Sequence, residues 1–281
     1  MQRWLRKRGS KLVPELIKSR IRGRFYGYRQ SRVKLNYRLL RDNGDLYISI
    51  DNRIKFRVTE EAKEDFTYHF VQNGASIEEM FGFIKVAENA RTLFDVGAHK
   101  GLFSLVFCAC GNSKRAIAYE PSPSLSLSGK TLASINHFEQ RMSIQNYAIS
   151  NIKTRMNVSL EASGFIRFAD DQNFYQKYEL EVTTIDNECR RLGIEPDILK
   201  IDIEGYEYEA LLGARELLSN KKPIICLELH LDLLEQRGIK PKLITDYLSE
   251  HGYYFFSCTG QKLSSTEVYD SINAVLRFIA K

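Results

Sequence analysis

Short apolar runs, separated by stretches of helical periodicity, fill the chain from Thr92 onwards. Unbroken apolar runs of a few residues are typical of buried strands, and apolar positions three or four apart are typical of helices. We predict strands at 92–96, 115–120, 142–149, 197–203, 223–229, 253–258 and 274–280, and helices at 102–110, 124–136, 206–219 and 241–250. Buried strands that alternate with helices indicate an α/β fold with a mostly parallel sheet. Because only the loop 259–273 separates the last two strands, we expect an antiparallel terminal hairpin.

The same patterns indicate further segments outside this alternation. Residues 45–58 alternate around an Asp-Asn turn and predict a small hairpin, and residues 65–90 are mostly helical in pattern. Residues 151–183 interrupt the α/β alternation, and we predict a β-rich insertion in which 153–160 pairs with 178–185. We divide the chain into a basic arm (1–41), a small N-terminal subdomain (42–90) and the main α/β domain (91–281).

Positive charge is concentrated in the arm. Residues 1–41 contain 14 lysines and arginines and a single acid, Glu15, whereas the whole chain has a net charge of +6. The rest of the chain is therefore net acidic. Apolar residues in the arm recur at near-helical spacing, so we expect either a short amphipathic helix or a flexible tail. Such an arm would contact something anionic, and a membrane surface is the partner we expect.

Composition excludes several classes of protein. No apolar run reaches the roughly 20 residues that span a bilayer, and no apolar segment typical of a secretory signal follows the first charges. The 5 cysteines include no C-x-x-C pair, which argues against a disulfide framework or a zinc site. We therefore expect reduced thiols and a cytoplasmic protein, with peripheral contact at a membrane.

A glycine-rich loop follows the first strand of the main domain. In "FDVGAHKG", Asp95 ends the strand, Gly97 permits a positive φ and a close approach of a ligand to the backbone, and Gly101 lets the next helix pack closely. The glycines are four residues apart with His99 between them, so the loop differs from the G-x-G-x-x-G pattern of dinucleotide sites. A compact nucleoside with a charged tail fits this spacing better.

Acids or a histidine end three further strands. Glu120 ends the second strand about 20 residues after the glycine loop, where an acid can accept both ribose hydroxyls. Asp202 and Glu204 lie two apart, so they share one face, and Lys200 on that face can neutralise one of them. His230 ends the next strand and is a candidate base.

These motifs together resemble the FkbM-type family of class I S-adenosylmethionine-dependent methyltransferases. The resemblance covers roughly residues 92–258 and rests on "FDVGAHKG", "YEPSP", "NYAIS", "TTIDNEC", "LKIDIEGYEYEALLGA" and "LELH" in the family's order. It implies a Rossmann-like seven-stranded methyltransferase sheet, S-adenosylmethionine as donor, and usually O-methylation, often of sugar hydroxyls in glycans or glycosylated natural products.

The resemblance also assigns roles to individual residues. It places Asp95, Gly97, His99, Gly101, Glu120, Asn146 and Ala148 at the cofactor, and Asp202, Glu204 and His230 at the acceptor. The family more often has asparagine where this chain has His99. In our mechanistic hypothesis, His230 or Asp202 removes the acceptor proton. The alternative is a Mg²⁺ ion held by Asp202 and Glu204, which would lower the pKa of the hydroxyl instead.

Two other functions remain open at this stage. A nucleic-acid methyltransferase or binder would use the basic arm on phosphates, but the acidic main domain argues against nucleic acid as a partner. An NAD-dependent oxidoreductase would share the α/β pattern, but the glycine spacing argues against it. We therefore expect a small-molecule or glycan acceptor that carries a hydroxyl.

Overall fold

The structure is a computed structural model that describes residues 33–67, 69–70, 74–160, 166–168, 177–269 and 275–281. Most of the basic arm lies outside these residues, so its helix and its contact with a membrane stay predictions. Among the described residues, every helix is too short or too polar to span a bilayer.

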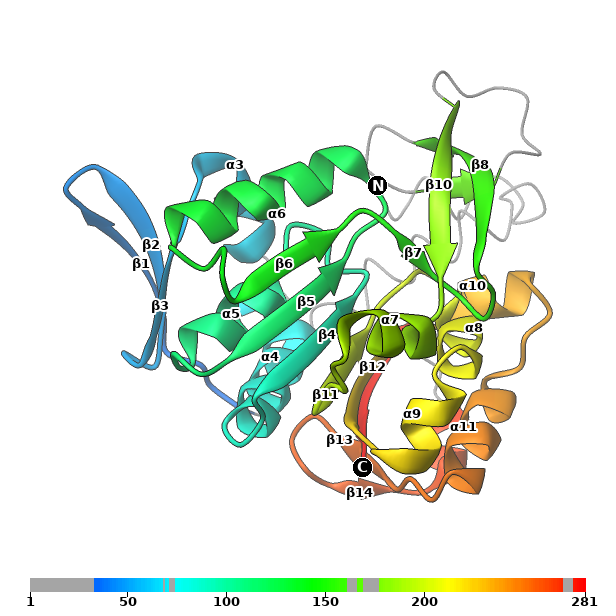
Figure 1. Cartoon of the computed structure of the whole chain (residues 1–281). Helices are drawn as coiled ribbons and strands as arrows, with labels where there is room; N and C mark the ends of the chain where they lie inside the picture. The colour runs from blue at the N-terminus through cyan, green and yellow to red at the C-terminus, as the bar shows by residue number, and fades with distance from the viewer. Residues whose placement is uncertain (1–32, 68, 71–73, 161–165, 169–176, 270–274) are drawn as a thin grey trace, which may run out of the picture.

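An eight-stranded sheet forms the centre of the molecule (Figure 1). Its strand order is β14-β13-β15-β12-β11-β4-β5-β6. The strands are β4 (Thr92–Val96), β5 (Arg115–Tyr119), β6 (Met142–Gln145), β11 (Ile198–Ile201), β12 (Ile224–His230), β13 (Phe255–Ser257), β14 (Lys262–Leu263) and β15 (Val275–Ala280). β4, β5, β6, β11 and β12 are parallel, whereas β15 is antiparallel to both β12 and β13. The predicted mostly parallel sheet with an antiparallel end is confirmed, and the short β14 adds an eighth strand.

Helices and hydrophobic cores cover both faces of this sheet. The helices are α3 (Glu60–Thr67), α4 (Gly74–Ala87), α5 (Leu102–Ala109), α6 (Pro123–Ile135), α7 (Ile185–Leu192), α8 (Glu207–Leu212), α9 (Arg215–Asn220), α10 (Leu231–Gln236), α11 (Pro241–Glu250) and α12 (Ser265–Tyr269). Alternate strand residues enter different cores, as the period of two requires. Leu93 packs in the core with α4, α5 and α6, and Phe94 in the core with α9 and α11.

The predicted helix over 206–219 is divided in the structure. α8 ends at Leu212 and α9 begins at Arg215, with Gly213 between them. A Cβ on Gly213 would overlap the backbone oxygen of Ser150, so the chain approaches a neighbouring loop too closely for any other residue. The prediction of one continuous helix was wrong because this close approach is a tertiary contact that the periodicity does not record.

The N-terminal subdomain is a three-stranded antiparallel sheet of β1 (Tyr37–Asp42), β2 (Asp45–Ile50) and β3 (Ile54–Val58). The expected hairpin is β2–β3, and both residues of its Asp-Asn turn have positive φ, as a tight hairpin turn requires. β1 extends across the boundary that we placed at residue 41. Ile48 and Phe56 share one core with α4 and α5, so this subdomain packs directly on the main domain.

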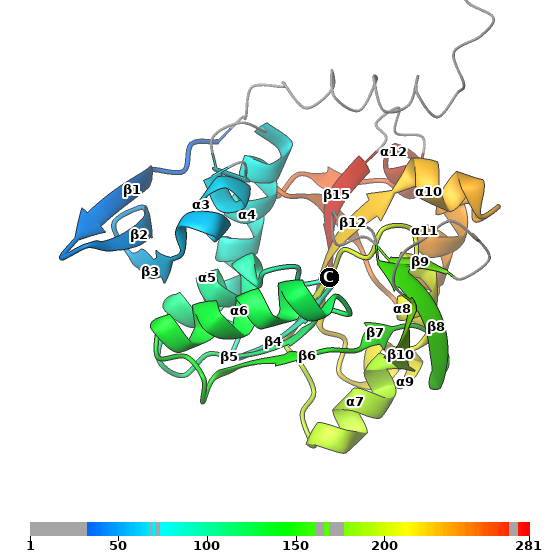
Figure 2. The same ribbon diagram turned by 90° about the horizontal axis from the view of Figure 1, so that it is seen from above.

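The insertion forms a second small sheet of β7 (Ala148–Ile149), β8 (Thr154–Leu160), β9 (Ile166–Phe168) and β10 (Lys177–Thr183). β8 and β10 are antiparallel, which confirms the predicted pairing. This sheet and the N-terminal sheet lie at opposite ends of the molecule in both views (Figure 2). The arrowheads of β5 and β6 point towards the insertion (Figure 1), so it stands at the carboxyl ends of these strands.

Candidate active site

The predicted site residues come together where β4, β5, β11 and β12 end. The amide of Asp202 donates to the carbonyl of Val96 at 2.9 Å, which joins the loop after β11 to the end of β4. The amide of His99 donates to the carboxylate of Glu120 at 2.8 Å, which joins the loop after β4 to the end of β5. Neighbouring loops at the carboxyl edge of a parallel sheet are the usual place for a ligand in this fold.

The positive φ angles and the close contacts within the protein itself require both glycines of the first loop. Gly97 has a φ of +80°, and a Cβ there would overlap the carbonyl oxygen of Asp202. Gly101 has a φ of +81°, and a Cβ there would lie 2.6 Å from the Cε of Met142 in β6. The close packing predicted for Gly101 is confirmed. At Gly97 the structure supplies a reason that sequence reasoning missed, since the close approach is made by a neighbouring loop.

Asp95 anchors the helix that follows the glycine loop. Its Oδ2 accepts hydrogen bonds from the backbone amide of Ser104 at 3.1 Å and from the Ser104 hydroxyl at 2.7 Å. Burial raises the pKa of Asp95 to about 6, although both bonds to Ser104 oppose the rise. The carboxylate therefore stabilises the first turns of α5 directly behind the loop.

Glu120 is held rigidly by backbone amides. Its Oε2 accepts from His99 and its Oε1 from Ser122, each at 2.8 Å. Burial raises the pKa of Glu120 to about 7. Because each carboxylate oxygen has two lone pairs, both oxygens keep the capacity to accept one more hydrogen bond.

Asn146 lies behind Glu120. Its amide donates to the backbone oxygens of Glu120 and Pro121 at 2.9 and 2.8 Å. The hydroxyl of Tyr178, from β10, also donates to the oxygen of Pro121 at 3.1 Å. Ala148 pairs with Val182 of β10. Asn146 and Ala148 thus connect the Glu120 turn to the inserted sheet.

Asp202, Glu204 and His230 form the second half of the site. The Nε2 atom of His230 lies 3.3 Å from Glu204 Oε2 and 3.7 Å from Asp202 Oδ1. Glu204 has a φ of +52°, an uncommon value for a residue with a side chain, and it directly precedes Gly205 at +93°. This turn brings the Glu204 carboxylate to His230.

The other ring nitrogen of His230 is held by a buried acid. Nδ1 lies 2.9 Å from Oε1 of Glu207, which is fully buried and also accepts from the amide of Gly205. Burial alone would lower the pKa of His230, but the hydrogen bond to Glu207 and the charges of Asp202 and Glu204 raise it to about 9. His230 is therefore an imidazolium at neutral pH.

A buried cation, Lys200, and a half-buried cation, Arg277, lie beneath these acids. The ammonium of Lys200 is 3.4 Å from Asp202 Oδ2, so the expected neutralisation of an acid by Lys200 is confirmed. Arg277 of β15 donates to Glu228 of β12 at 2.6 Å, and Glu79 of α4 pairs with both cations. Sequence reasoning missed Glu79 and Arg277. The available signal for Arg277 was a single charge within an apolar strand, whereas Glu79 is one of two adjacent acids in α4.

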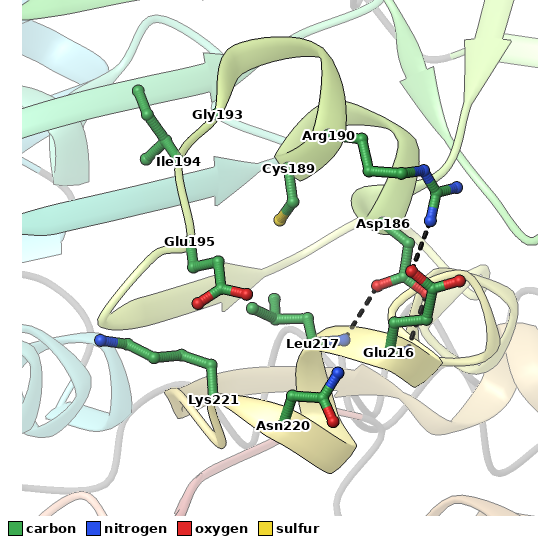
Figure 3. Close-up of a pocket in the computed structure, with 10 residues that line it drawn as sticks. All are labelled: Asp186, Cys189, Arg190, Gly193, Ile194, Glu195, Glu216, Leu217, Asn220 and Lys221. Atoms are coloured by element: carbon green, nitrogen blue, oxygen red, sulfur yellow. Dashed lines mark hydrogen bonds and ion pairs between the residues drawn. The ribbon is translucent and has the colours of Figure 1, made fainter.

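A separate cavity lies at the opposite end of the sheet. Its volume is about 560 Å³, and Figure 3 shows the side chains that line it between α7 and α9. Ile194 and Glu195, just before β11, form one wall. The carboxylate of Asp186 accepts from the amides of Glu216 and Leu217 and so caps α9. The polar groups here serve the fold, and the cavity is distinct from the site at the carboxyl ends.

The main sheet is Rossmann-like, with the antiparallel strand β15 between β12 and β13, and its carboxyl edge carries the acidic cluster. The family model described as the Methyltransferase FkbM domain matches residues 95–255, more than half of the chain. The chain therefore belongs to the FkbM methyltransferase family, which implies S-adenosylmethionine as donor.

Several solved structures are similar to this chain at low identity and with TM-scores below 0.5. The methyltransferase FkbM from Methylobacillus flagellatus KT has a TM-score of 0.45 and 18% identity, over 69% of this chain and 43% of that one. A precorrin-6y C5,15-methyltransferase from Geobacter metallireducens has a TM-score of 0.40 and 12% identity, over 74% of this chain and 87% of that one. An O-methyltransferase from Bacillus cereus in complex with SAH has a TM-score of 0.37 and 9% identity, over 78% and 84%. No curated protein matches the chain.

We expect Gly97→Ala to destabilise the protein strongly. The added methyl group overlaps the carbonyl of Asp202, and overpacking of this kind costs about 1–3 kcal/mol or more. Gly193→Ala is the matched control, since Gly193 also has a positive φ, +62°, but nothing lies within 4 Å of its Cβ position. Urea unfolding should show a loss about 2 kcal/mol larger for Gly97→Ala. Equal losses would mean that the two loops can separate easily.

We expect His230 to titrate near pH 9. Its folded pKa lies above the ordinary value of 6.5, so the His230–Glu207 pair stabilises the fold fully below pH 6.5 and loses that contribution as the pH rises through about 9. NMR of histidine-labelled protein measures the midpoint, with the resonance assigned by its loss in His230→Gln. Glu207→Gln should move the midpoint down towards 6.5. A wild-type midpoint at or below 6.5 would contradict the role given to Glu207.

Proposed function

We propose that the protein transfers a methyl group from S-adenosylmethionine to a hydroxyl on a sugar, a glycan or a glycosylated or lipid-linked small molecule. The observation that carries this proposal is the junction of two half-sites. The Glu120 turn and the Asp202–Glu204–His230 cluster come from strand ends on either side of β4. The amide of Asp202 bonds to Val96 at the end of β4, and the amide of His99 in the loop after β4 bonds to Glu120, so the β4 loop links the two halves. A donor at one half would lie beside an acceptor at the other.

The residues at the end of β5 suit the ribose of the donor. Both oxygens of Glu120 are held by backbone amides and keep acceptor capacity, which matches the two hydroxyls of a ribose. When bound, S-adenosylmethionine supplies a methyl group on a positively charged sulfur that an oxygen can displace in line. The acidic cluster beyond Gly97 favours a positively charged group at this place.

Asp202 is the group that we assign to accept the acceptor proton. We assign a proton to Nδ1 of His230, which lies 2.9 Å from Glu207, while its Nε2 faces Asp202 and Glu204. Lys200 and His230 contact different oxygens of Asp202 and hold the carboxylate in one orientation. As the new O–C bond forms, the hydroxyl proton becomes strongly acidic, so an ionised carboxylate suffices to remove it. His230 then acts as a cation that orients Asp202.

The open side of the site favours a neutral acceptor. The Glu204 side chain is 44% exposed and that of Asp202 is 29% exposed, whereas Lys200 is 1% exposed. An incoming molecule would therefore meet carboxylates first, and these repel phosphate and carboxylate groups. Carboxylates accept hydrogen bonds from hydroxyls, so a sugar hydroxyl is the chemical group that fits this edge best.

Donor binding tests the first half of the proposal. Isothermal titration with S-adenosylhomocysteine should give micromolar binding to the wild-type protein, and Glu120→Gln should weaken it by about 10- to 100-fold. An amide places a donor against the amides of His99 or Ser122 and loses a charged acceptor for the ribose. Glu195→Gln, in the cavity at the opposite end of the sheet, is the control and should bind normally. Unchanged affinity in Glu120→Gln would remove Glu120 from the donor site.

Methyl transfer tests the second half. Labelled S-adenosylmethionine should methylate neutral glycosides or glycans in an acceptor panel, and glycosides with phosphate or carboxylate next to the hydroxyl should react poorly. Asp202→Asn should lower turnover at least about 100-fold while binding of S-adenosylhomocysteine stays within about twofold. Asp246→Asn, on the surface of α11, is the control. Transfer to RNA or DNA alone, or normal turnover in Asp202→Asn, would contradict the proposal.

A further inference from the structure

Lys200 occupies the centre of the carboxylate cluster. Its ammonium lies 3.0 Å from Glu79 Oε1, 3.4 Å from Asp202 Oδ2 and 3.9 Å from Glu228 Oε2. The side chain is 1% exposed, and the ammonium also lies 4.8 Å from the centre of the Phe103 ring. A buried ammonium persists only where carboxylates compensate the loss of water. Here three of them converge on it from α4, the loop after β11 and β12.

Arg277, whose side chain is 16% exposed, provides a second cation in the same cluster. It donates to Glu228 Oε1 at 2.6 Å, to Glu228 Oε2 at 3.1 Å and to Glu79 Oε2 at 2.9 Å. Both oxygens of Glu228 are thus occupied by a guanidinium in a bidentate pair, which is the strongest geometry for this contact. Glu79 bridges the two cations and lies outside the segment that the family model matches.

Part of this cluster has the composition of a divalent metal site. Among the residues that the structure describes, ligand atoms of Asp202, Glu228 and His230 lie within 4.8 Å of one another. Magnesium and related ions need several oxygen ligands that are free to turn towards the ion at about 2.0–2.6 Å. In this structure Glu228 is held by Arg277, and one oxygen of Asp202 faces Lys200. A divalent ion would also have to compete with the ammonium and the guanidinium for the same carboxylate oxygens.

We infer that Lys200, together with Arg277, is the resident cation of this site and takes the place that a divalent metal would hold. The inference rests on the proposed function, because it states how that site balances its charge. The ammonium keeps Asp202 oriented, and the guanidinium neutralises Glu228. Donor binding and methyl transfer then proceed without a divalent ion. This inference opposes the alternative in which Asp202 and Glu204 hold Mg²⁺, since Lys200 already contacts Asp202.

Titration of the full-length protein with MnCl₂ tests the inference, using Mn²⁺ as a probe whose free concentration is measurable by electron paramagnetic resonance. The wild-type protein should not bind Mn²⁺ at submillimolar concentrations, with or without S-adenosylhomocysteine. Its affinity for S-adenosylhomocysteine should be the same in EDTA and in MgCl₂. Submillimolar Mn²⁺ binding that Asp202→Asn abolishes would overturn the inference.

A substitution of the lysine provides the complementary result. Lys200→Met keeps the length of the side chain but removes the charge, so the acids of the cluster should acquire at least 10-fold tighter Mn²⁺ binding. Lys85→Met on the exposed side of α4 is the matched control and should bind no more Mn²⁺ than the wild type. A folded Lys200→Met protein with no gain in Mn²⁺ affinity would contradict the inference.

A failure of this inference and a failure of the proposed function can be told apart. If Lys200→Met does not fold, the comparison of EDTA with MgCl₂ on the wild type decides. If the wild type does not bind S-adenosylhomocysteine, the proposed function fails, and the Mn²⁺ titration of the protein alone still tests the assignment of Lys200.

Discussion

The burial of the Lys200 ammonium is the constraint around which the site is organised. Removing a charge from water costs several kcal/mol unless partners compensate it. The partners of Lys200 come from α4, from the loop after β11 and from β12, and Arg277 of β15 shares two of them. One network of charged side chains therefore joins α4, the central strands β11 and β12, and the strand β15. The segment before the glycine loop belongs to the site as well as to the fold.

The register of the sheet places this network on one face. Lys200 pairs with Asp95 on β4 and with Cys226 on β12, and Glu228 pairs with Arg277 on β15. Strand residues on the other face, such as Leu199 and Leu227, enter a purely hydrophobic core. A row of charged residues thus runs beneath α4 and α5, and it becomes more exposed towards the carboxyl edge. Along this row the buried Lys200 lies inside the sheet, and the more exposed Asp202 and Glu204 lie where the strand ends.

Sequence reasoning predicted the parts of the fold that depend on local patterns. All strands of the main sheet except β14, the antiparallel end, the insertion pairing and the helix at 241–250 were predicted from periodicity and are confirmed. It missed β1, because almost all of that strand is exposed, so no apolar alternation marks it, and it acquires its structure by pairing with β2.

The candidate site, like the fold, could be predicted from the sequence only in part. Residues in motifs at strand ends, such as Glu120 and Asp202, were found because the chain order of strands predicts their meeting. Glu79 and Arg277 are separated by nearly the whole described chain, and they meet only because α4 packs across β15. The acid partner of His230 was missed for another reason. Glu207 lies within the first turn of α8, where an acid is ordinarily a helix-stabilising residue, and only the turn at Gly205 directs it inwards.

Backbone strain marks the same two loops. His99 and Glu204 both have φ near +52°, a conformation that costs a residue with a side chain about 1–3 kcal/mol. Each gains a specific contact from it. The amide of His99 reaches Glu120, and the carboxylate of Glu204 reaches His230. Because Gly97 lets these loops lie against each other, the strain in one is supported by the packing of the other. The donor half and the acceptor half of the site are therefore structurally coupled. A substitution in either loop is expected to shift the backbone of both.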